Sequence, residues 1–186
     1  MRISEFLDRA ERAPIIAAIH DKLWADVLNS PVDIIFYLRG NILTIKDRIK
    51  EAHENGKFIF VHVDLCDGVG KDRAGIEFLA NCGVDGIVTT RAQHIRQAKE
   101  LGLLTVQRFF ALDSQGLASI EDMINNTRPD LIEIMPGVIT KIIEKFSKFD
   151  IPVIAGGLIE TKSEVTGAIG SGAIAVSTGR SELWYL

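Results

Sequence analysis

Short runs of consecutive hydrophobic residues recur along the chain, separated by segments in which hydrophobic residues have the spacing of an amphipathic helix. The runs predict eight strands: Ile15–Ile19, Val32–Leu38, Lys57–Val63, Gly86–Thr89, Leu103–Phe109, Leu131–Met135, Pro152–Leu158 and Ala173–Val176. The intervening segments predict helices at Asp21–Leu28, from Asn41 or Thr44 to Asn55, at Asp72–Asn81, Ala92–Leu101, Ser114 to about Asn126, Val138–Phe149 and Thr161–Ile169, with a short terminal helix. An opening helix from Arg2 to Ala13 is expected to cover one end of the fold.

Strands that alternate with helices are typical of a parallel sheet with helical crossovers. Eight such units favour closure into a (β/α)₈ barrel, and no Gly-x-Gly-x-x-Gly follows the first strand to suggest a dinucleotide-binding sheet. The chain has 186 residues, fewer than the roughly 250 usual for this fold, so its loops and helices must be short. We therefore expect an α/β protein with one barrel domain over residues 1–186.

The last two strands end in residues that suit a phosphate group. Gly156 and Gly157 close the seventh strand, and Ser177, Thr178 and Gly179 follow the eighth. Glycines let the backbone approach an anion and present its N–H groups, and barrels of this kind often bind phosphate at these two strand ends. The alternative interpretation of the two adjacent glycines is a tight turn from strand to helix.

Other polar residues stand where strands end, and function in this fold lies at those ends. Strand alternation places His62 and Asp64 on one face and directs Glu133 inward. Gln107, Arg108 and Arg91 are further candidates for contact with a ligand. Structural roles remain open, because His62 and Asp64 can satisfy each other, Glu133 can pair with Arg108, and Arg91 can simply be solvated.

Composition narrows the function classes. Hydrophobic residues make up 47% and charged residues 25% of the chain, as in an ordinary globular protein, and no apolar run approaches the roughly 20 residues that span a bilayer. The formal net charge of −4 argues mildly against a surface that binds nucleic acid everywhere. The N-terminal segment Met1 to Glu5 carries an acidic residue early and has no apolar block like that of a signal peptide, so we expect a cytoplasmic location. Cys66 and Cys82 have no metal-binding spacing, and we expect free thiols and no cofactor.

Several barrel chemistries find little support. A Schiff-base aldolase needs a lysine in a dry pocket, and no lysine stands within a central strand. His62, Asp64 and Glu133 could hold a divalent cation, but this is a weak site for a metal. An isomerase or lyase that acts on a small phosphorylated metabolite, with Asp64 and Glu133 as acid and base, remains the alternative to a non-enzyme.

The motifs at these strand ends, taken in order and with their spacing, resemble the bacterial glycerol uptake operon antiterminator family. The resemblance covers Ile15 to Trp184. It is carried by His62-Val63-Asp64-Leu65 with Gly68, Thr89-Thr90-Arg91, Val106 to Asp113, Ile132 to Gly137, Ala155 to Ile159 with Thr161, Gly172-Ala173 to Ser177-Thr178, and Leu183-Trp184.

The resemblance implies a barrel regulator, not an enzyme, that senses glycerol 3-phosphate and acts on the leader RNA of glycerol-utilisation genes by preventing early termination. Its ligand fits the phosphate cradle described above. Asp64, Gln107 and Glu133 could then hold the glycerol hydroxyls, with Arg108 or Arg91 adding charge. A homo-oligomer is possible, and so is a barrel that binds a phosphorylated metabolite and signals through a protein partner.

Lys and Arg contacts to phosphates supply most nucleic-acid affinity, and two helices offer such residues. Arg91, Arg96 and Lys99 belong to one of these helices, whereas Lys141, Lys145 and Lys148 form a stripe along the other. A solvated outer face is the alternative interpretation of the stripe. RNA binding is therefore implied by the resemblance and not by composition.

Overall fold

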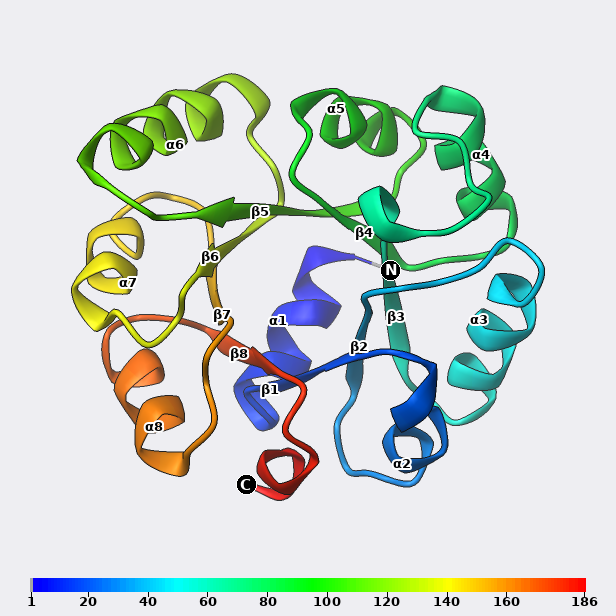
Figure 1. Cartoon of the computed structure of the whole chain (residues 1–186), viewed down its shortest axis with the longest axis horizontal. Coiled ribbons are helices and arrows are strands. Elements are labelled where there is room, and N and C mark those ends of the chain that lie inside the picture. Colours follow the sequence, from blue (N-terminus) through cyan, green and yellow to red (C-terminus); the bar gives the residue numbers. More distant parts are fainter. Residues whose placement is uncertain (1) are drawn as a thin grey trace.

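A closed barrel of eight parallel strands, paired in sequence order from β1 to β8, forms the centre of the computed structural model (Figure 1). The structure describes residues 2–186. The strands are β1 (Ile15–Ile19), β2 (Ile34–Tyr37), β3 (Phe58–His62), β4 (Gly86–Thr89), β5 (Leu104–Phe110), β6 (Leu131–Met135), β7 (Val153–Gly156) and β8 (Ala175–Thr178). Pairing of β8 with β1 closes the ring, so the predicted (β/α)₈ barrel is confirmed.

The helices lie outside the ring of strands, except for the first (Figure 1). They are α1 (Ile3–Arg12), α2 (Trp24–Leu28), α3 (Ile45–Glu54), α4 (Arg73–Asn81), α5 (Ala92–Glu100), α6 (Ser114–Thr127), α7 (Thr140–Phe146) and α8 (Lys162–Gly170). Three 3₁₀ turns, η1 (Asp21–Leu23), η2 (Val63–Leu65) and η3 (Ser181–Tyr185), follow β1, β3 and β8. Each therefore stands directly after a strand, at the barrel end where the candidate residues were expected.

The barrel interior is filled at one end by α1. Alternate strand residues such as Phe36, Phe60 and Val88 form one buried cluster with Phe6 and Ala10 of α1. The rings of Phe6 and Phe60 meet edge to face, with centroids 5.6 Å apart. The neighbouring strand residues form a second cluster with the surrounding helices. This period of two decides which strand-end side chains face the lumen.

For three of the elements whose bounds differ from the prediction, the structure gives the physical reason. The eighth strand spans Ala175–Thr178 and so starts and ends two residues later than predicted. It starts later because the N–H of Ala173 donates to the carbonyl of Ala168, which makes Ala173 part of the end of α8. Helix α7 is shorter than Val138–Phe149, because Gly137 is bonded to the end of β7 and the chain turns at Ser147. Asp113, and not Ser114, caps α6, and its carboxylate accepts the N–H of Gly116 at 2.7 Å.

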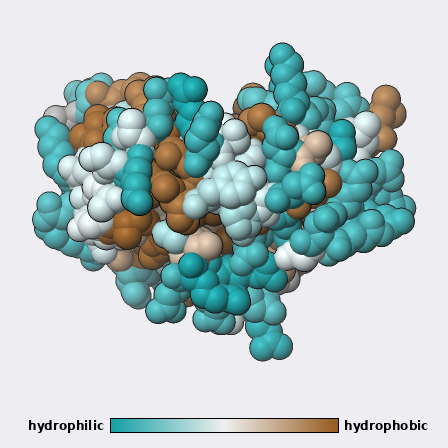
Figure 2. Space-filling model, turned by 90° about the horizontal axis from the view of Figure 1, so that it is seen from below, coloured by the Kyte–Doolittle hydropathy of each residue, from teal (hydrophilic) through white to brown (hydrophobic). Residues whose placement is uncertain are grey.

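The side of the barrel seen in Figure 2 is mainly hydrophilic, with hydrophobic residues in separate patches between charged side chains. Within residues 2–186, no helix combines the length and the apolar character that crossing a bilayer requires.

Candidate functional site

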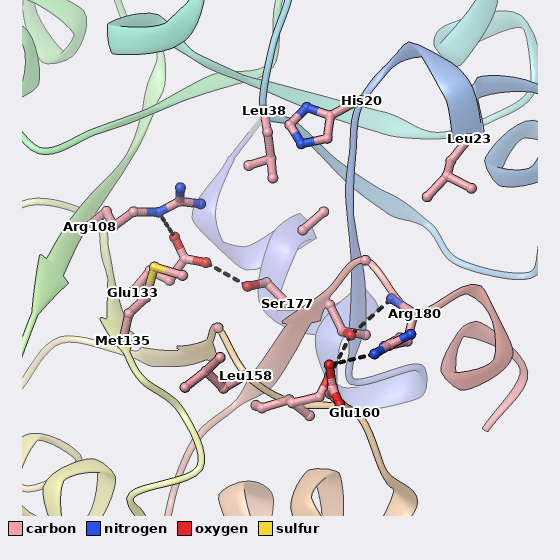
Figure 3. A pocket seen from close by; sticks show the side chains of 15 residues that line it. His20, Leu23, Leu38, Arg108, Glu133, Met135, Leu158, Glu160, Ser177 and Arg180 are labelled. Carbon is pink, nitrogen blue, oxygen red and sulfur yellow. Dashed lines mark hydrogen bonds and ion pairs between the residues drawn. The ribbon is translucent and has the colours of Figure 1, made fainter.

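A pocket of about 460 Å³ opens at the C-terminal ends of the strands, at the end of the barrel opposite α1. Residues from β5, β6, β8 and from the loops after β1, β2, β7 and β8 line it. Figure 3 shows Arg108, Glu133 and Ser177 along one wall, with His20 and Leu38 across from them. The expected location, at the ends of the last two strands, therefore coincides with a real concave site.

Three lumen-facing side chains form a connected network at the inner end of this pocket. Arg108 Nε donates to Glu133 Oε2 at 2.6 Å, and the Ser177 hydroxyl donates to Glu133 Oε1 at 2.5 Å. Glu133 is fully buried and Arg108 is 7% exposed, so each needs the other as counter-charge. The structural pairing that the sequence left open for Glu133 and Arg108 is thus present.

Gly156 makes this network possible. A Cβ atom at this position would lie 2.7 Å from Ser177 Oγ and closer still to the Glu133 carboxylate. Gly156 is paired with Ser177 in the sheet, so the missing side chain leaves the space through which Glu133 reaches Ser177 from two strands away. The network therefore explains why position 156 is a glycine, and no ligand is needed for that explanation.

The loops after β7 and β8 present backbone donors to the pocket. Gly157 and Leu158 both have left-handed φ angles, of +75° and +60°. Within the part of the chain that the structure describes, the N–H groups of Gly157, Leu158 and Gly179 donate to no loop, turn or side-chain acceptor. All three residues line the pocket. Successive N–H groups in left-handed turns can form a concavity that suits an anion.

Thr178 is already engaged by the protein itself. Its hydroxyl donates to the carbonyl of Ile159 at 2.9 Å and accepts the N–H of Arg180 at 3.1 Å. The indole Nε1 of Trp184 donates to the Thr178 carbonyl at 3.1 Å. Thr178 therefore fixes the two loops of the pocket to each other, and its hydroxyl proton is not free for a ligand.

Asp64 lies beyond β3 in η2 and is not among the residues that line this pocket. Its Oδ2 accepts the N–H of Thr90 at 2.8 Å, its Oδ1 accepts the Thr89 hydroxyl at 3.1 Å, and Arg91 Nε lies 3.3 Å from Oδ1. Burial alone would raise the pKa of Asp64, but the hydrogen bonds from Thr90 and Thr89 outweigh it and hold the pKa below its usual value. Asp64 and Arg91 thus secure the β4–α5 turn and do not line the pocket.

Gln107 faces the helix layer, contrary to the expectation that it stands with Arg108 at the mouth. It alternates with Val106 and Arg108, whose side chains face the lumen, and its Oε1 accepts the hydroxyl of Thr127 in α6 at 2.6 Å. Because adjacent strand residues point to opposite faces, only one of Gln107 and Arg108 can face a ligand. The geometry selects Arg108.

His62 lies on the lumen side of β3, where its ring is 4% exposed. Burial first, and the charge of Arg108 second, lower its pKa to about 4, so the imidazole is neutral near pH 7. Among the described residues its Nδ1 has no hydrogen-bond partner, and no hydrogen bond joins it to Asp64. The mutual satisfaction of His62 and Asp64 that the sequence allowed is therefore absent.

The sequence interpretation missed a rim of residues from the loops. Arg180 directly follows Gly179, and its Nη2 forms an ion pair of 2.5 Å with Glu160 Oε1 (Figure 3). Leu158, which is 70% exposed, and His20 also line the pocket. The position of Arg180 one residue beyond a predicted phosphate turn was a usable signal, whereas Glu160 becomes visible only when β7 and β8 are placed side by side.

Comparison with known proteins supports one assignment. The E. coli (strain K12) protein YgcP, whose function is uncharacterized, is 34% identical over 176 residues, covering 93% of this chain and 92% of its own. A glycerol uptake operon antiterminator regulatory protein from Listeria monocytogenes (str. 4b F2365) matches with a TM-score of 0.87 and 38% identity, covering 91% of this chain and 94% of its own. A glycerol uptake operon antiterminator-related protein from Thermotoga maritima MSB8 matches with a TM-score of 0.84 and 33% identity, covering 92% of this chain and 98% of its own.

The family model described as glycerol-3-phosphate responsive antiterminator matches residues 15–184, which include every strand of the barrel and every residue of the Arg108–Glu133–Ser177 network. With its fold, its pocket and its relatives in agreement, this chain belongs to the glycerol-3-phosphate responsive antiterminator family.

Proposed function

We propose that this protein is a glycerol-3-phosphate-responsive antiterminator, which binds glycerol 3-phosphate in the mouth of its barrel and acts on the leader RNA of glycerol-utilisation genes in the cytoplasm. Membership of the family carries this proposal. The pocket supports it, because backbone donors and polar side chains meet at the ends of β7 and β8.

In this proposal the phosphate binds the free N–H groups of Gly157, Leu158 and Gly179. Arg180 supplies the positive charge that the sequence interpretation assigned to Arg91 or Arg108. Its pairing with Glu160 is solvated on both sides, with side chains 55% and 57% exposed, so the pair is weak and a phosphate dianion can compete for the guanidinium. Ser177 lies beside this cradle, and its hydroxyl can reorient toward the ligand.

The glycerol end of the ligand then extends toward Arg108 and Glu133, at the inner end of the pocket. A pocket of about 460 Å³ has ample room for a ligand with three carbons and one phosphate. His62 lies deeper, within reach of the guanidinium charge.

The enzymatic alternative loses its acid and base in this geometry. Asp64 is held by Thr90 and Arg91, and both oxygens of Glu133 are occupied by Arg108 and Ser177. A general acid and base must both lie within hydrogen-bond reach of the reacting groups, and Asp64 does not line the pocket in which Glu133 stands. We therefore propose a sensor and not a catalyst.

For the RNA we propose the surface formed by Arg96 and Lys99 of α5 with Arg128 at the end of α6. Lys99 donates to the backbone carbonyl of Arg128, which holds the ammonium group of Lys99 at the end of α6, and Arg96 forms no ion pair within the described residues. The stripe on α7 is weaker in charge, because Lys145 pairs with Glu121 and Lys148 with Glu144. Released counterions drive such binding, so it should weaken as salt rises.

Two measurements test this proposal. Calorimetry with glycerol 3-phosphate should give saturable binding, and heat changes that do not saturate at millimolar ligand, in protein shown to be folded, would refute the ligand. Gel shifts of leader RNA should change with ligand and weaken in an Arg96→Gln, Lys99→Gln double variant. The matched control is Lys145→Gln, Lys148→Gln, which removes one charge from α7 and one from the segment directly after it and should leave the shift unchanged.

A further inference from the structure

The inner end of the pocket carries charges that cancel. Arg108 brings one positive charge and Glu133 one negative charge, in contact at 2.6 Å and largely removed from water. Ser177 holds the second carboxylate oxygen at 2.5 Å, so the glutamate is fixed from two sides. A ligand that reaches this end therefore meets strong dipoles without a net charge.

Hydrogen-bonding capacity nevertheless remains there. Arg108 uses only Nε for Glu133, and its two terminal nitrogens donate to no other residue in the part of the chain that the structure describes. His62, which is buried and does not itself line the pocket, has an Nδ1 without a partner in residues 2–186, and its ring is uncharged at neutral pH. Guanidinium N–H donors whose charge is balanced by Glu133 match alcohol hydroxyl groups.

We propose that Glu133 is a specificity-determining residue, which admits the hydroxyl-bearing end of a singly phosphorylated polyol and rejects ligands whose far end carries a second anionic group. This inference rests on the proposed function and names the ligand class of the same pocket. A carboxylate placed against Arg108 would also lie near the buried carboxylate of Glu133. The negative charge of Glu133 offsets the attraction of this carboxylate to the Arg108 guanidinium. The water that the carboxylate loses on entering the pocket is therefore not replaced by an equally favourable partner.

The backbone supports a role for the network that goes beyond filling space. Glu133 reaches Ser177 only because Gly156 between them lacks a side chain. Arg108 of β5, Glu133 of β6 and Ser177 of β8 are therefore joined across Gly156 of β7. This arrangement balances the charge of Arg108 at the inner end of the pocket. An apolar residue at position 133 would fill the lumen more simply, but it would leave the guanidinium as a site for anions.

The test compares two ligands of equal length. Glycerol 3-phosphate and 3-phosphoglycerate share the phosphate and differ at the far carbon, which is a hydroxymethyl group in one and a carboxylate in the other. Calorimetry on the wild-type protein should show that glycerol 3-phosphate binds at least about tenfold more tightly, because the carboxylate of 3-phosphoglycerate loses hydration without gaining a net counter-charge.

The variant Glu133→Gln keeps the shape and the acceptor oxygen but uncovers the charge of Arg108. It should shift the affinity ratio at least about tenfold toward 3-phosphoglycerate, since an opposite charge now faces the carboxylate. Ser177→Ala is the matched control, because it removes a hydrogen bond from the same carboxylate without changing any charge. It should weaken both ligands alike and leave their ratio unchanged.

The outcomes separate this inference from the function on which it rests. Equal wild-type affinities for the two ligands, or a Glu133→Gln ratio equal to that of the wild type, would overturn the role of Glu133 and leave the proposed sensor intact. Failure of both ligands to bind the folded wild type would overturn both proposals. If circular dichroism shows Glu133→Gln to be unfolded, the wild-type ratio alone decides.

Discussion

The carboxylate of Asp64 accepts the backbone N–H of Thr90 at 2.8 Å and thereby joins the end of β3 to the turn between β4 and α5. This contact changes the role of a residue that the sequence placed among the ligand contacts. Asp64 receives a backbone donor, two threonine hydroxyls and a nearby guanidinium, all from the segment Thr89–Arg91. Asp64 therefore anchors the turn between β4 and α5.

We expect Asp64→Asn to lower the free energy of unfolding by about 1–3 kcal/mol, because an amide in this position loses charge-assisted hydrogen bonds. Ligand affinity should change little. Since the pKa of Asp64 is depressed in the folded state, its contribution is present at neutral pH and is lost as pH falls through that depressed value. Urea unfolding and calorimetry measure the two effects.

Asp67→Asn is the control for this prediction. Asp67 is 62% exposed and lies 3.8 Å from Arg39, so its removal should cost less than about 0.5 kcal/mol. A large loss of ligand affinity in Asp64→Asn with unchanged stability would contradict the anchoring role.

His62 should make stability depend on pH. Its pKa is about 4 in the folded protein and 6.5 in an unperturbed histidine, so between these values the unfolded chain binds a proton that the folded chain does not. The free energy of unfolding should therefore fall as pH decreases from 6.5 to 4, by up to roughly 3 kcal/mol. Urea unfolding at a series of pH values measures this slope.

Replacing the histidine by His62→Gln should flatten the slope between pH 6.5 and pH 5, where most carboxylates stay ionised. His20→Gln, which changes an exposed histidine at the same barrel mouth, should leave it as in the wild type. A His62→Gln slope equal to that of the wild type would mean that the folded protein protonates His62 normally.

Gly157 offers a test of the phosphate cradle with an internal control. A Cβ atom here would lie 2.6 Å from the terminal methyl of Met135, and its φ of +75° is strained for any L-residue. Gly157→Ala should therefore lower stability by at least about 1 kcal/mol and weaken glycerol 3-phosphate binding at least about tenfold, because the N–H groups of the turn must move. Calorimetry and thermal unfolding give the two values.

Gly102 has nearly the same φ, +74°, but nothing lies within 4 Å of a Cβ atom there. Gly102→Ala should show the loss of stability without the loss of affinity, since Gly102 follows α5 and lies at the opposite end of β5 from the pocket. If both variants bind ligand as the wild type does, the phosphate site lies elsewhere.

Leu158 stores strain in the same loop. It is one of two non-glycine residues with positive φ in the described chain, and 70% of its side chain is exposed, so little packing compensates. Leu158→Gly should raise the free energy of unfolding by about 1 kcal/mol, since left-handed backbone costs glycine nothing. The melting temperature should rise accordingly in a thermal scan.

Leu112 is the matched position, because it is 83% exposed in a loop but has no left-handed φ. Leu112→Gly should slightly lower stability by adding freedom to the unfolded chain. A fall in melting temperature for both variants would show that Leu158 contributes more by contact than it costs by strain.

Much of the fold could be predicted, because hydrophobic runs and glycine turns act locally. The bounds of β1, β4 and β6 match the prediction residue for residue, whereas β8 does not. Ala173 and Ile174 are as apolar as typical strand residues. The N–H of Ala173, however, donates to the carbonyl of Ala168 and thereby ends α8, so Ala173 does not belong to the strand. Hydropathy cannot distinguish an apolar residue in a turn from one in a strand.

The candidate site was predictable in position but not in role. Strand alternation correctly directed Glu133 and His62 to the lumen, and the pairing of Glu133 with Arg108 was one of two open interpretations. Asp64 was misplaced because the chain bends into η2 after His62, which ends the alternation. Gln107 was placed at the mouth from its nearness to the strand end, although its neighbour Arg108 occupies the inward position.

The sequence by itself determined that this chain forms eight βα units and that glycines and hydroxyls meet at the last two strand ends. Only the tertiary structure decided which of these groups remain free. Thr178 and Gly156 serve the protein's own contacts, whereas Gly157, Leu158 and Gly179 line the pocket and their N–H groups donate to no loop, turn or side-chain acceptor among the described residues. A local pattern specifies where a strand ends, but hydrogen bonds between residues distant in sequence, such as Glu133 and Ser177, form only when the barrel closes.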